Sequence, residues 1–291
     1  MVRRLTAVAK PGRRIIQIIS AIGFNGYLVG FMEGKLYQGS LKQIPCLSFN
    51  CTSCPGALGS CPVGMLQAGI AGMLTAPATI LIVGFILLAG IMLGRLVCGW
   101  FCPFGLIQEL IFKVPLPKIA WRESYRRLEY VKYLILLVFV LLLPALAGYG
   151  LSSTPFCRYL CPAEVLEGNL PLMLVRSTPL AAASIWLIAK AVFLIGLLLL
   201  AMLIFKPFCR FFCPLGAIYS IFNGISLYRL QLDGHKCNGC GVCESQCPVD
   251  IAVYQSPNHR ECMRCNQCLV CPAGALAIKT CGKKKNDEIP W

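Results

Sequence analysis

The chain has 291 residues, of which 57% are hydrophobic and 13% are charged, and its mean hydropathy is +0.70. This composition excludes an ordinary water-soluble globular protein and predicts a protein that lies in a membrane. The formal charge of +15 would also suit a nucleic-acid-binding protein. Most of the excess, however, flanks apolar stretches or sits in the C-terminal tail, so we expect no nucleic-acid partner.

Four stretches are long and apolar enough to cross a hydrocarbon core about 30 Å thick. They cover roughly residues 15–32, 75–94, 130–150 and 181–205. The segment 95–127 carries six basic residues, whereas 33–74 and 152–179 carry two each. Because basic loops stay in the cytoplasm, we expect both termini there and a multi-pass location in the inner (cytoplasmic) membrane. No small-residue cleavage site follows the first stretch, which we interpret as a retained anchor.

A Cys-x3-Cys-Pro motif follows the second stretch, from Cys98 to Cys102, and another follows the fourth, from Cys209 to Cys213. Cysteines at i and i+4 share one face of a helix, and the proline favours the start of a new helix. The order of stretch, outer cysteine loop, stretch and inner motif thus occurs twice. It predicts an all-α membrane domain over residues 1–228, with four helices in a two-plus-two repeat. The four inner thiolates match the ligand count of a cubane cluster.

The loops expected on the outer side carry six further cysteines, which are more than one cluster needs. They are Cys46, Cys51, Cys54, Cys61, Cys157 and Cys161. The last two form a third Cys-x3-Cys-Pro motif. We leave open whether the membrane cysteines hold one or two further clusters, act as redox-active thiols or form disulfides. Small buried side chains without chemistry are the alternative, and three copies of one motif disfavour it.

The C-terminal part of the chain, residues 229–281, carries eight cysteines in two runs. The first run, from Cys237 to Cys247, has the spacing of bacterial ferredoxins and predicts an α+β module with two [4Fe-4S] clusters. The second run is one residue shorter before its last cysteine. Structural zinc is the alternative, which long intervening loops would suit better. By the crossed ligand rule, the two predicted sets are Cys237, Cys240, Cys243 and Cys271, and Cys262, Cys265, Cys268 and Cys247. Cys281 and a basic tail, 282–291, follow.

The sequence contains no motif that would bind another cofactor. The two histidines, His235 and His259, both lie in the ferredoxin module, so no intramembrane pair can bind haem. They stand near cluster cysteines, but we interpret them as polar surface residues. No nucleotide-binding loop is present either.

Lys190 falls within the fourth stretch, and we expect it to extend towards the outer surface. Proton transfer would need an acid near the membrane surface, and the candidates, which we expect to be ordinary interfacial carboxylates, are Glu109, Glu123, Glu129, Glu164 and Glu167.

The four stretches, the paired inner motifs and the C-terminal two-cluster module resemble the membrane-bound ferredoxin-type proteins typified by NapH and MauN, with more distant kin among NosR-like and CcoG-like proteins. The resemblance implies a quinol-oxidising electron-transfer subunit of a larger complex, which exchanges electrons between a quinone pool and a ferredoxin or reductase subunit. The alternative is a maturation factor that reduces metal ions or disulfides of a client on the outer face. The outer run of cysteines and the short last spacing depart from the family pattern and suggest a divergent branch.

Overall fold

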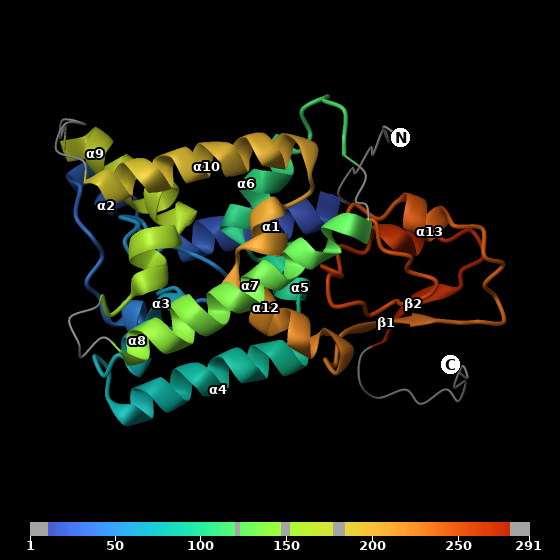
Figure 1. Ribbon diagram of the computed structural model, residues 1–291, viewed down its shortest axis with the longest axis horizontal. Coiled ribbons are helices and arrows are strands. Elements are labelled where there is room, and N and C mark those ends of the chain that lie inside the picture. The colour runs from blue at the N-terminus through green and yellow to red at the C-terminus, as the bar shows by residue number, and fades with distance from the viewer. Residues whose placement is uncertain (1–10, 120–122, 147–151, 177–183, 280–291) are drawn as a thin grey trace.

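The computed structural model describes residues 11–119, 123–146, 152–176 and 184–279. A bundle of helices makes up most of the molecule, and a small module with two strands lies at one end of it (Figure 1). We call this end of the bundle the ferredoxin side and the opposite end the far side. Cys281 and the basic tail lie outside the described residues.

Three helices among the described residues are long and apolar enough to cross a membrane. They are α4 (Ala76–Leu93), α10 (Ile185–Leu203), and a continuous helix made of α7 (Val131–Ile135), the π-helical η3 (Leu136–Leu142) and α8 (Leu143–Ala145). A 3-10 segment, η2 (Glu123–Tyr130), leads into α7. These helices lie where the second, third and fourth apolar stretches predict them. Their lipid-facing positions are aliphatic, as at the exposed Leu81 and Val192.

The structure divides the first predicted stretch, so a fourth long span is not confirmed. Helix α1 (Pro11–Phe24) stops after 14 residues, and the short α2 (Leu28–Glu33) follows. The break is held by the loop that carries the outer cysteines. The Leu58 N–H donates to the Phe24 carbonyl, and the Tyr27 N–H donates to the Gly56 carbonyl. Backbone groups that would continue the helix are therefore satisfied by this loop instead.

Short helices that begin at a proline fill the middle of the bundle. They are α3 (Pro62–Ile70), α6 (Pro103–Ile111) and α12 (Pro214–Ile221), and each has a cysteine as its N-cap. Proline suits the first helical turn, where no backbone donor is needed. The predicted new helix after each inner Cys-Pro pair is therefore confirmed. Between these and the long helices lie η1 (Ser40–Gln43), α5 (Leu96–Trp100), η5 (Phe156–Leu160), η6 (Glu164–Asn169), α9 (Leu170–Arg176), α11 (Pro207–Phe211) and η8 (Phe222–Gly224).

Two sharp turns send the chain back into the bundle on the ferredoxin side. Gly94 ends α4 with a φ of +54°, and α5 then runs between the long helices (Figure 1). Lys206 follows α10 with a φ of +48°, in the left-handed region that lysine seldom adopts. Non-helical backbone at membrane depth is tolerated only where protein surrounds it, and both turns are buried.

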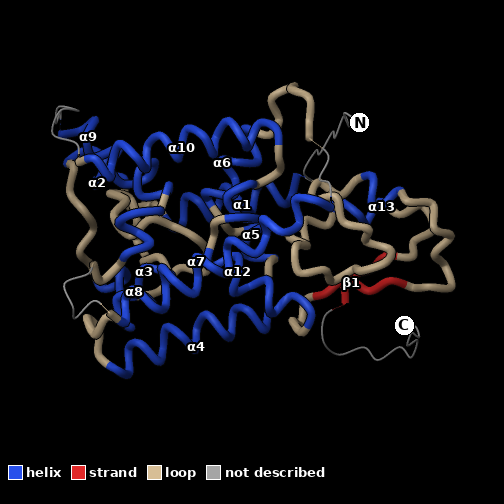
Figure 2. Tube along the Cα trace, in the orientation of Figure 1, coloured by secondary structure: helices blue, strands red, loops and turns tan. Residues whose placement is uncertain are grey.

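The ferredoxin module has little regular structure. Its strands β1 (Arg229–Leu232) and β2 (Leu276–Lys279) pair antiparallel, with Leu230 opposite Ile278, and the short helices α13 (Val242–Ser245) and η9 (Gln267–Val270) lie between them in sequence (Figure 2). Its apolar core continues into the membrane domain, because Phe112, Phe205 and Cys209 belong to the same buried cluster as Leu230 and Met263.

Gly99 sets how closely the module approaches the bundle. A Cβ atom at this position would overlap the carbonyl oxygen of Met263, so only glycine permits the contact. We expect Gly99→Ala to destabilise the docked module by about 1–3 kcal/mol. Thermal unfolding in detergent, with limited proteolysis of the connection at 222–229, measures this. Gly196→Ala is the matched control, since a Cβ there meets nothing. Equal melting of both variants would contradict the expectation.

Candidate iron–sulfur centres

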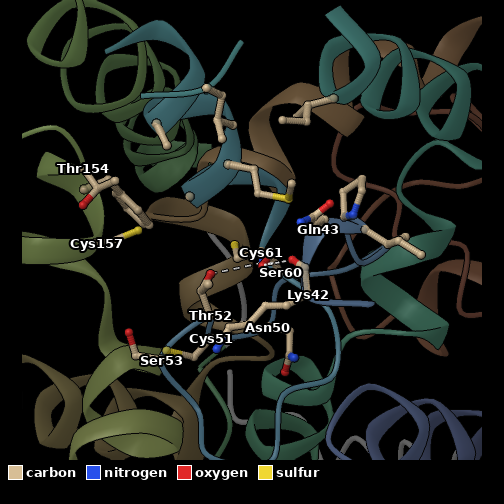
Figure 3. Close-up of a pocket in the computed structure, with 18 of the residues that line it drawn as sticks. Lys42, Gln43, Asn50, Cys51, Thr52, Ser53, Ser60, Cys61, Thr154 and Cys157 are labelled. Atoms are coloured by element: carbon tan, nitrogen blue, oxygen red, sulfur yellow. Dashed lines mark hydrogen bonds between the residues drawn. The ribbon is translucent and has the colours of Figure 1, made fainter. Parts of the chain in front are cut away.

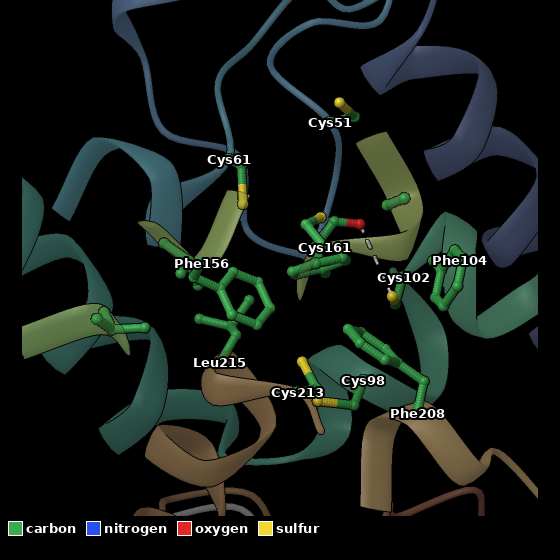
Figure 4. Close-up of a cluster of buried hydrophobic side chains, with 14 of the residues drawn as sticks. Cys51, Cys61, Cys98, Cys102, Phe104, Phe156, Cys161, Phe208, Cys213 and Leu215 are labelled. Atoms are coloured by element: carbon green, nitrogen blue, oxygen red, sulfur yellow. Dashed lines mark hydrogen bonds between the residues drawn. The ribbon is translucent and has the colours of Figure 1, made fainter. Parts of the chain in front are cut away.

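The two inner motifs bring their four cysteines together around one small cavity inside the bundle. Figure 4 shows three of them, Cys98, Cys102 and Cys213. This ferredoxin-side set consists of Cys98, Cys102, Cys209 and Cys213, all of them buried. Their thiols line this cavity, together with Ser48 and Phe49. These two residues belong to the loop that carries Cys46, Cys51, Cys54 and Cys61, which we call the far-side loop. The sequence predicted the meeting of these thiols but placed it at the membrane surface. The structure places it among the helices, because α5 and α11 turn inward.

Backbone and side-chain donors point at the sulfurs of this set. The Gly105 N–H lies 3.3 Å from Cys102 Sγ, and the Gly216 N–H lies 3.3 Å from Cys213 Sγ. The amide of Gln108 lies 3.6 Å from Cys209 Sγ, and its oxygen accepts the Phe208 N–H at 3.0 Å. Donors of this kind stabilise the negative charge of ligated thiolates. The four buried thiols and these donors therefore fit the ligand set of a [4Fe-4S] cluster.

Two fully buried cations flank the ferredoxin-side set, each three residues before the first cysteine of a motif. Their contacts are exchanged between the motifs. Arg95 Nη2 donates to the Cys209 carbonyl at 2.8 Å, and Lys206 Nζ donates to the Cys98 carbonyl at 3.1 Å. Both cations interact electrostatically with the Cys98 and Cys209 thiols. Positive charge beside the thiolates offsets the cost of burying them. Sequence reasoning missed both residues, although a basic residue at the same spacing in both motifs was a visible signal.

In the ferredoxin module, cysteines that are distant in sequence are neighbours. Cys247 interacts electrostatically with Cys262 and Cys265, and Cys268 interacts with all three. Cys243 interacts in the same way with Cys237 and Cys271. The crossed ligand rule needs these groupings, and the assignment of ligands itself stays a prediction. His235 is exposed, as expected, whereas His259 is half-buried and its Nδ1 accepts the Glu261 N–H.

Burial makes two thiols of the module reluctant to ionise on their own. It raises the pKa of Cys247 to about 12 and that of Cys262 to about 11, and neighbouring thiols add to both shifts. A metal ligand must be a thiolate, so bound iron would have to supply the positive charge that ionises these groups. Among the described residues, no three Cys, His, Asp or Glu side chains lie close enough to hold a single metal ion.

A buried ion-pair network joins the module to the membrane domain. Glu261, in the module, lies 2.6 Å from Arg95 Nη1 and also pairs with Lys132 of α7. Burial alone would raise the pKa of the Glu261 carboxyl, but the two cations lower it to about 2. Two hydrogen bonds reinforce the contact, from Trp100 Nε1 to the Arg264 carbonyl at 3.0 Å and from Asn223 Nδ2 to the Cys262 carbonyl at 2.9 Å. The module is therefore fixed directly beside the ferredoxin-side set.

The outer cysteines lie on the far side, around a large cavity (Figure 3). Four of them line it, namely Cys51, Cys61, Cys157 and Cys161. We call these four the far-side set. Cys46 and Cys54 are buried nearby but do not line the cavity. Within the described residues all 18 cysteines are free, so none of the disulfides left open by the sequence is present there.

This far-side cavity has a volume of about 1310 Å³, and α4 forms part of its wall. The wall includes Ile80 and Leu81, which are 70% and 73% exposed on the lipid-facing side of that helix. Its polar lining includes Lys42, Asn50 and Glu164 next to the thiols. Small-molecule sites measure about 300–1,000 Å³ and are mostly apolar with a few polar groups. The cavity thus has the size and lining for a large apolar ligand.

Three of the candidate acids are part of ion pairs. Glu109 is buried, pairs with Arg13 of α1, lies 3.5 Å from Lys206 and accepts from Gln17 Nε2 at 3.0 Å. Its interpretation as an ordinary interfacial carboxylate is wrong, because α1 carries partners that are 92 and 96 residues away. Glu129 pairs with Arg210 at 3.1 Å.

Lys190 does not reach the surface as expected. It is buried and pairs with Glu164 at 2.7 Å, at the edge of the far-side cavity. Glu167 accepts the Cys51 N–H at 2.9 Å. The side chain of Glu123 lies outside the described residues.

Comparisons with known proteins agree with these centres. A family model described as a 4Fe-4S binding domain matches residues 75–122, 133–166 and 186–230, and a second 4Fe-4S model matches 230–252. The first three matches each contain one Cys-x3-Cys-Pro motif. No solved structure matches the chain.

Three relatives illustrate the range of similarity. The uncharacterized protein MJ0750 of Methanocaldococcus jannaschii is 32% identical over 227 residues, which are 75% of this chain and 84% of that protein. The methylamine utilization ferredoxin-type protein MauN of Paracoccus denitrificans is 29% identical over 243 residues, 81% of this chain and 74% of MauN. The regulatory protein NosR of Stutzerimonas stutzeri is 32% identical over 180 residues, 59% of this chain and 22% of NosR.

The fold and these centres define a membrane-embedded iron–sulfur protein. The chain belongs to the family of membrane-bound 4Fe-4S ferredoxin-type proteins. It is an iron–sulfur electron-transport protein.

Proposed function

We propose that this protein passes electrons between a membrane quinone pool and a protein redox partner, a ferredoxin or a reductase subunit, within a larger complex. The observation that carries the proposal is the far-side cavity. Its wall includes the lipid-exposed Ile80 and Leu81 of α4 and four thiols. Three of these thiols belong to the same buried cluster as three cysteines of the ferredoxin-side set (Figure 4). An apolar redox molecule could thus reach the cysteines without leaving the membrane.

The electron route uses residues of this chain in a fixed order. [4Fe-4S] clusters, when bound, transfer one electron at a time. The ferredoxin module would hold two, and the ferredoxin-side set would hold another. Cys209 packs in the same buried cluster as Cys243, Cys247 and Cys268, so the module and the membrane centre share one apolar wall. The far-side loop reaches the same centre, because the Phe49 carbonyl accepts from Cys102 Sγ at 3.8 Å.

Oxidation of a quinol also releases two protons for each two electrons, so the cavity needs a group that can accept them. Glu164 lines the cavity and is 23% exposed, while its partner Lys190 is buried. We assign the role of proton acceptor to Glu164, which its ion pair with Lys190 holds at the cavity wall. The orientation with both termini in the cytoplasm of the inner membrane is part of the same proposal, which puts the quinone site on the outer half of the bilayer.

A bulky side chain in the cavity tests the quinone site. Gly84 lines the cavity and a Cβ there meets nothing, so Gly84→Phe fills space without a clash. We expect this variant to slow the reoxidation of dithionite-reduced protein by added quinone about tenfold or more, as followed by cluster absorbance in liposomes. Gly196→Phe on the lipid face of α10 is the matched control and should leave the rate unchanged. A Gly84→Phe rate equal to the control would overturn the quinone site.

The second candidate function is a maturation factor that reduces metal ions or disulfides of a client. The free, surplus thiols Cys46 and Cys54 beside the far-side set favour it. Iron and acid-labile sulfide in anaerobically purified protein separate the two functions. About eight irons per chain would fill the ferredoxin module alone and support thiol chemistry, while about twelve or more would support the electron route.

A further inference from the structure

We infer that the far-side set, Cys51, Cys61, Cys157 and Cys161, holds a second [4Fe-4S] cluster within the membrane domain, and that Cys46 and Cys54 are not among its ligands. The four thiols come from three separate segments and line one cavity. Cys161 interacts electrostatically with Cys61, Cys157 and Cys51, and Cys157 interacts with Cys61 and Cys51. This inference goes beyond the proposed electron route, because the ferredoxin-side set can bind iron without a cluster on the far side.

The first argument is that the far-side set repeats the construction of the ferredoxin-side set. Gln67 stands six residues after Cys61, as Gln108 stands six residues after Cys102. The Gln67 oxygen accepts the Phe156 N–H at 2.9 Å, and its amide lies 3.6 Å from Cys157 Sγ. The corresponding distances at Gln108 are 3.0 Å to the Phe208 N–H and 3.6 Å to Cys209 Sγ.

The agreement extends to the rest of the two glutamines' contacts. Each amide also donates to the carbonyl four residues before it at 3.3 Å, that of Val63 for Gln67 and that of Phe104 for Gln108. Both glutamines are buried. A buried amide that bridges two segments at a sulfur is costly unless every donor is used, so its recurrence marks a built site. By this correspondence Cys61, Cys157 and Cys161 occupy the places of Cys102, Cys209 and Cys213.

The fourth ligand is where the two sites differ. The position that corresponds to Cys98 is four residues before Cys61, and alanine occupies it, at Ala57. Three thiolates would leave one iron of a cubane without a protein ligand. Cys51 supplies the missing thiol from the far-side loop. Its backbone is fixed by the N–H bond to Glu167 at 2.9 Å, and its sulfur lies against Gly168.

The two remaining cysteines of the loop are placed differently. The Cys46 sulfur lies against Gly59, and the one thiol among its main electrostatic partners is Cys61. Cys54 has Glu167 and Lys42 as its charged neighbours and no thiol among its main electrostatic partners. Neither residue lines the cavity. The structure thus selects four of the six far-side cysteines, a choice that the spacing in the sequence does not allow.

Iron and sulfide analysis of single variants tests the ligand set. Cys51→Ser and Cys161→Ser should each lose about four irons and four sulfides per chain relative to the unchanged protein, and should lose one cluster signal in the paramagnetic resonance spectrum. Cys54→Ser, the matched control from the same loop, should keep all of them. Full iron content in Cys51→Ser, or a loss of about four irons in Cys46→Ser or Cys54→Ser, would overturn the assignment.

A second measurement covers variants that fail to fold. Mössbauer spectroscopy of the unchanged, 57Fe-labelled protein should account for about sixteen irons per chain, all in [4Fe-4S] clusters. About twelve or fewer would overturn the far-side cluster. Neither measurement involves a quinone or a redox partner. A protein with sixteen irons whose reoxidation is indifferent to quinone would therefore contradict the proposed function and leave this inference standing.

Discussion

A Cys209→Ser variant is expected to lose about four irons and to stop electron exchange between the far-side cavity and the ferredoxin module, while the module keeps its own clusters. Serine offers no thiolate. The Cys209 sulfur lies near the Gln108 amide and interacts electrostatically with Lys206 and Arg95. Its position in the shared apolar cluster makes it the contact between the membrane centre and the module. Quinone-driven reoxidation should fall to the background rate of protein-free liposomes.

The measurement combines iron analysis, the resonance spectrum of the reduced module and stopped-flow reoxidation of the same preparation. Cys98→Ser should behave as Cys209→Ser does, because both belong to the ferredoxin-side set. Cys54→Ser, a buried cysteine outside both sets, is the control for loss of a thiol as such. Undiminished transfer in both Cys98→Ser and Cys209→Ser would remove the ferredoxin-side set from the route.

The second large effect is expected from Glu261→Gln, which removes the charge that joins the module to the bundle. Arg95 and Lys132 are fully buried, and the change leaves them without their carboxylate. Breaking a buried ion pair on one side costs about 3–5 kcal/mol. We expect a lower melting temperature, measured as loss of cluster absorbance on heating, and faster proteolysis near 222–229.

Asp233→Asn is the matched control for Glu261→Gln. Asp233 belongs to the same module and pairs with Lys236 at 3.4 Å, but this pair is exposed to solvent, so its removal should cost less than about 1 kcal/mol.

Because the pKa of Glu261 is lowered to about 2, the stabilisation by the ion-pair network is fully present above the ordinary pKa of 4.5 and is lost as the pH falls towards 2. Between pH 5 and 8 the gap between the two variants should therefore stay constant. A gap that closes on mild acidification would contradict the assignment.

The sequence predicted the parts of this protein that depend on local spacing. Proline after cysteine marks the starts of α3, α6 and α12, and long apolar stretches mark α4 and α10. The pairing of Cys98 with Cys209 could also be predicted, since both motifs follow a long stretch and end in the same way. In each case the signal lies within a few residues of the structure that it produces.

What the sequence could not show depends on contacts between distant segments. The break after Phe24 is held by Gly56 and Leu58, and no hydropathy profile of the first stretch contains them. The depth of the cysteines depends on the turns at Gly94 and Lys206, which reverse the chain within a membrane domain. Lys190 was expected at the surface because its partner, Glu164, lies 26 residues before it in a separate segment.

The exchanged cations bear on how this protein matures in the cell. Arg95 is made more than a hundred residues before the carbonyl of Cys209 that it binds, and Lys206 reaches back to Cys98 in the same way. During synthesis the first half of the ferredoxin-side set therefore has Arg95 beside it but waits for Lys206 until α10 is in place. A cluster held by both halves would need both of them, so its loading would follow the insertion of α10. The docked module, which is made last, lies directly beside this set.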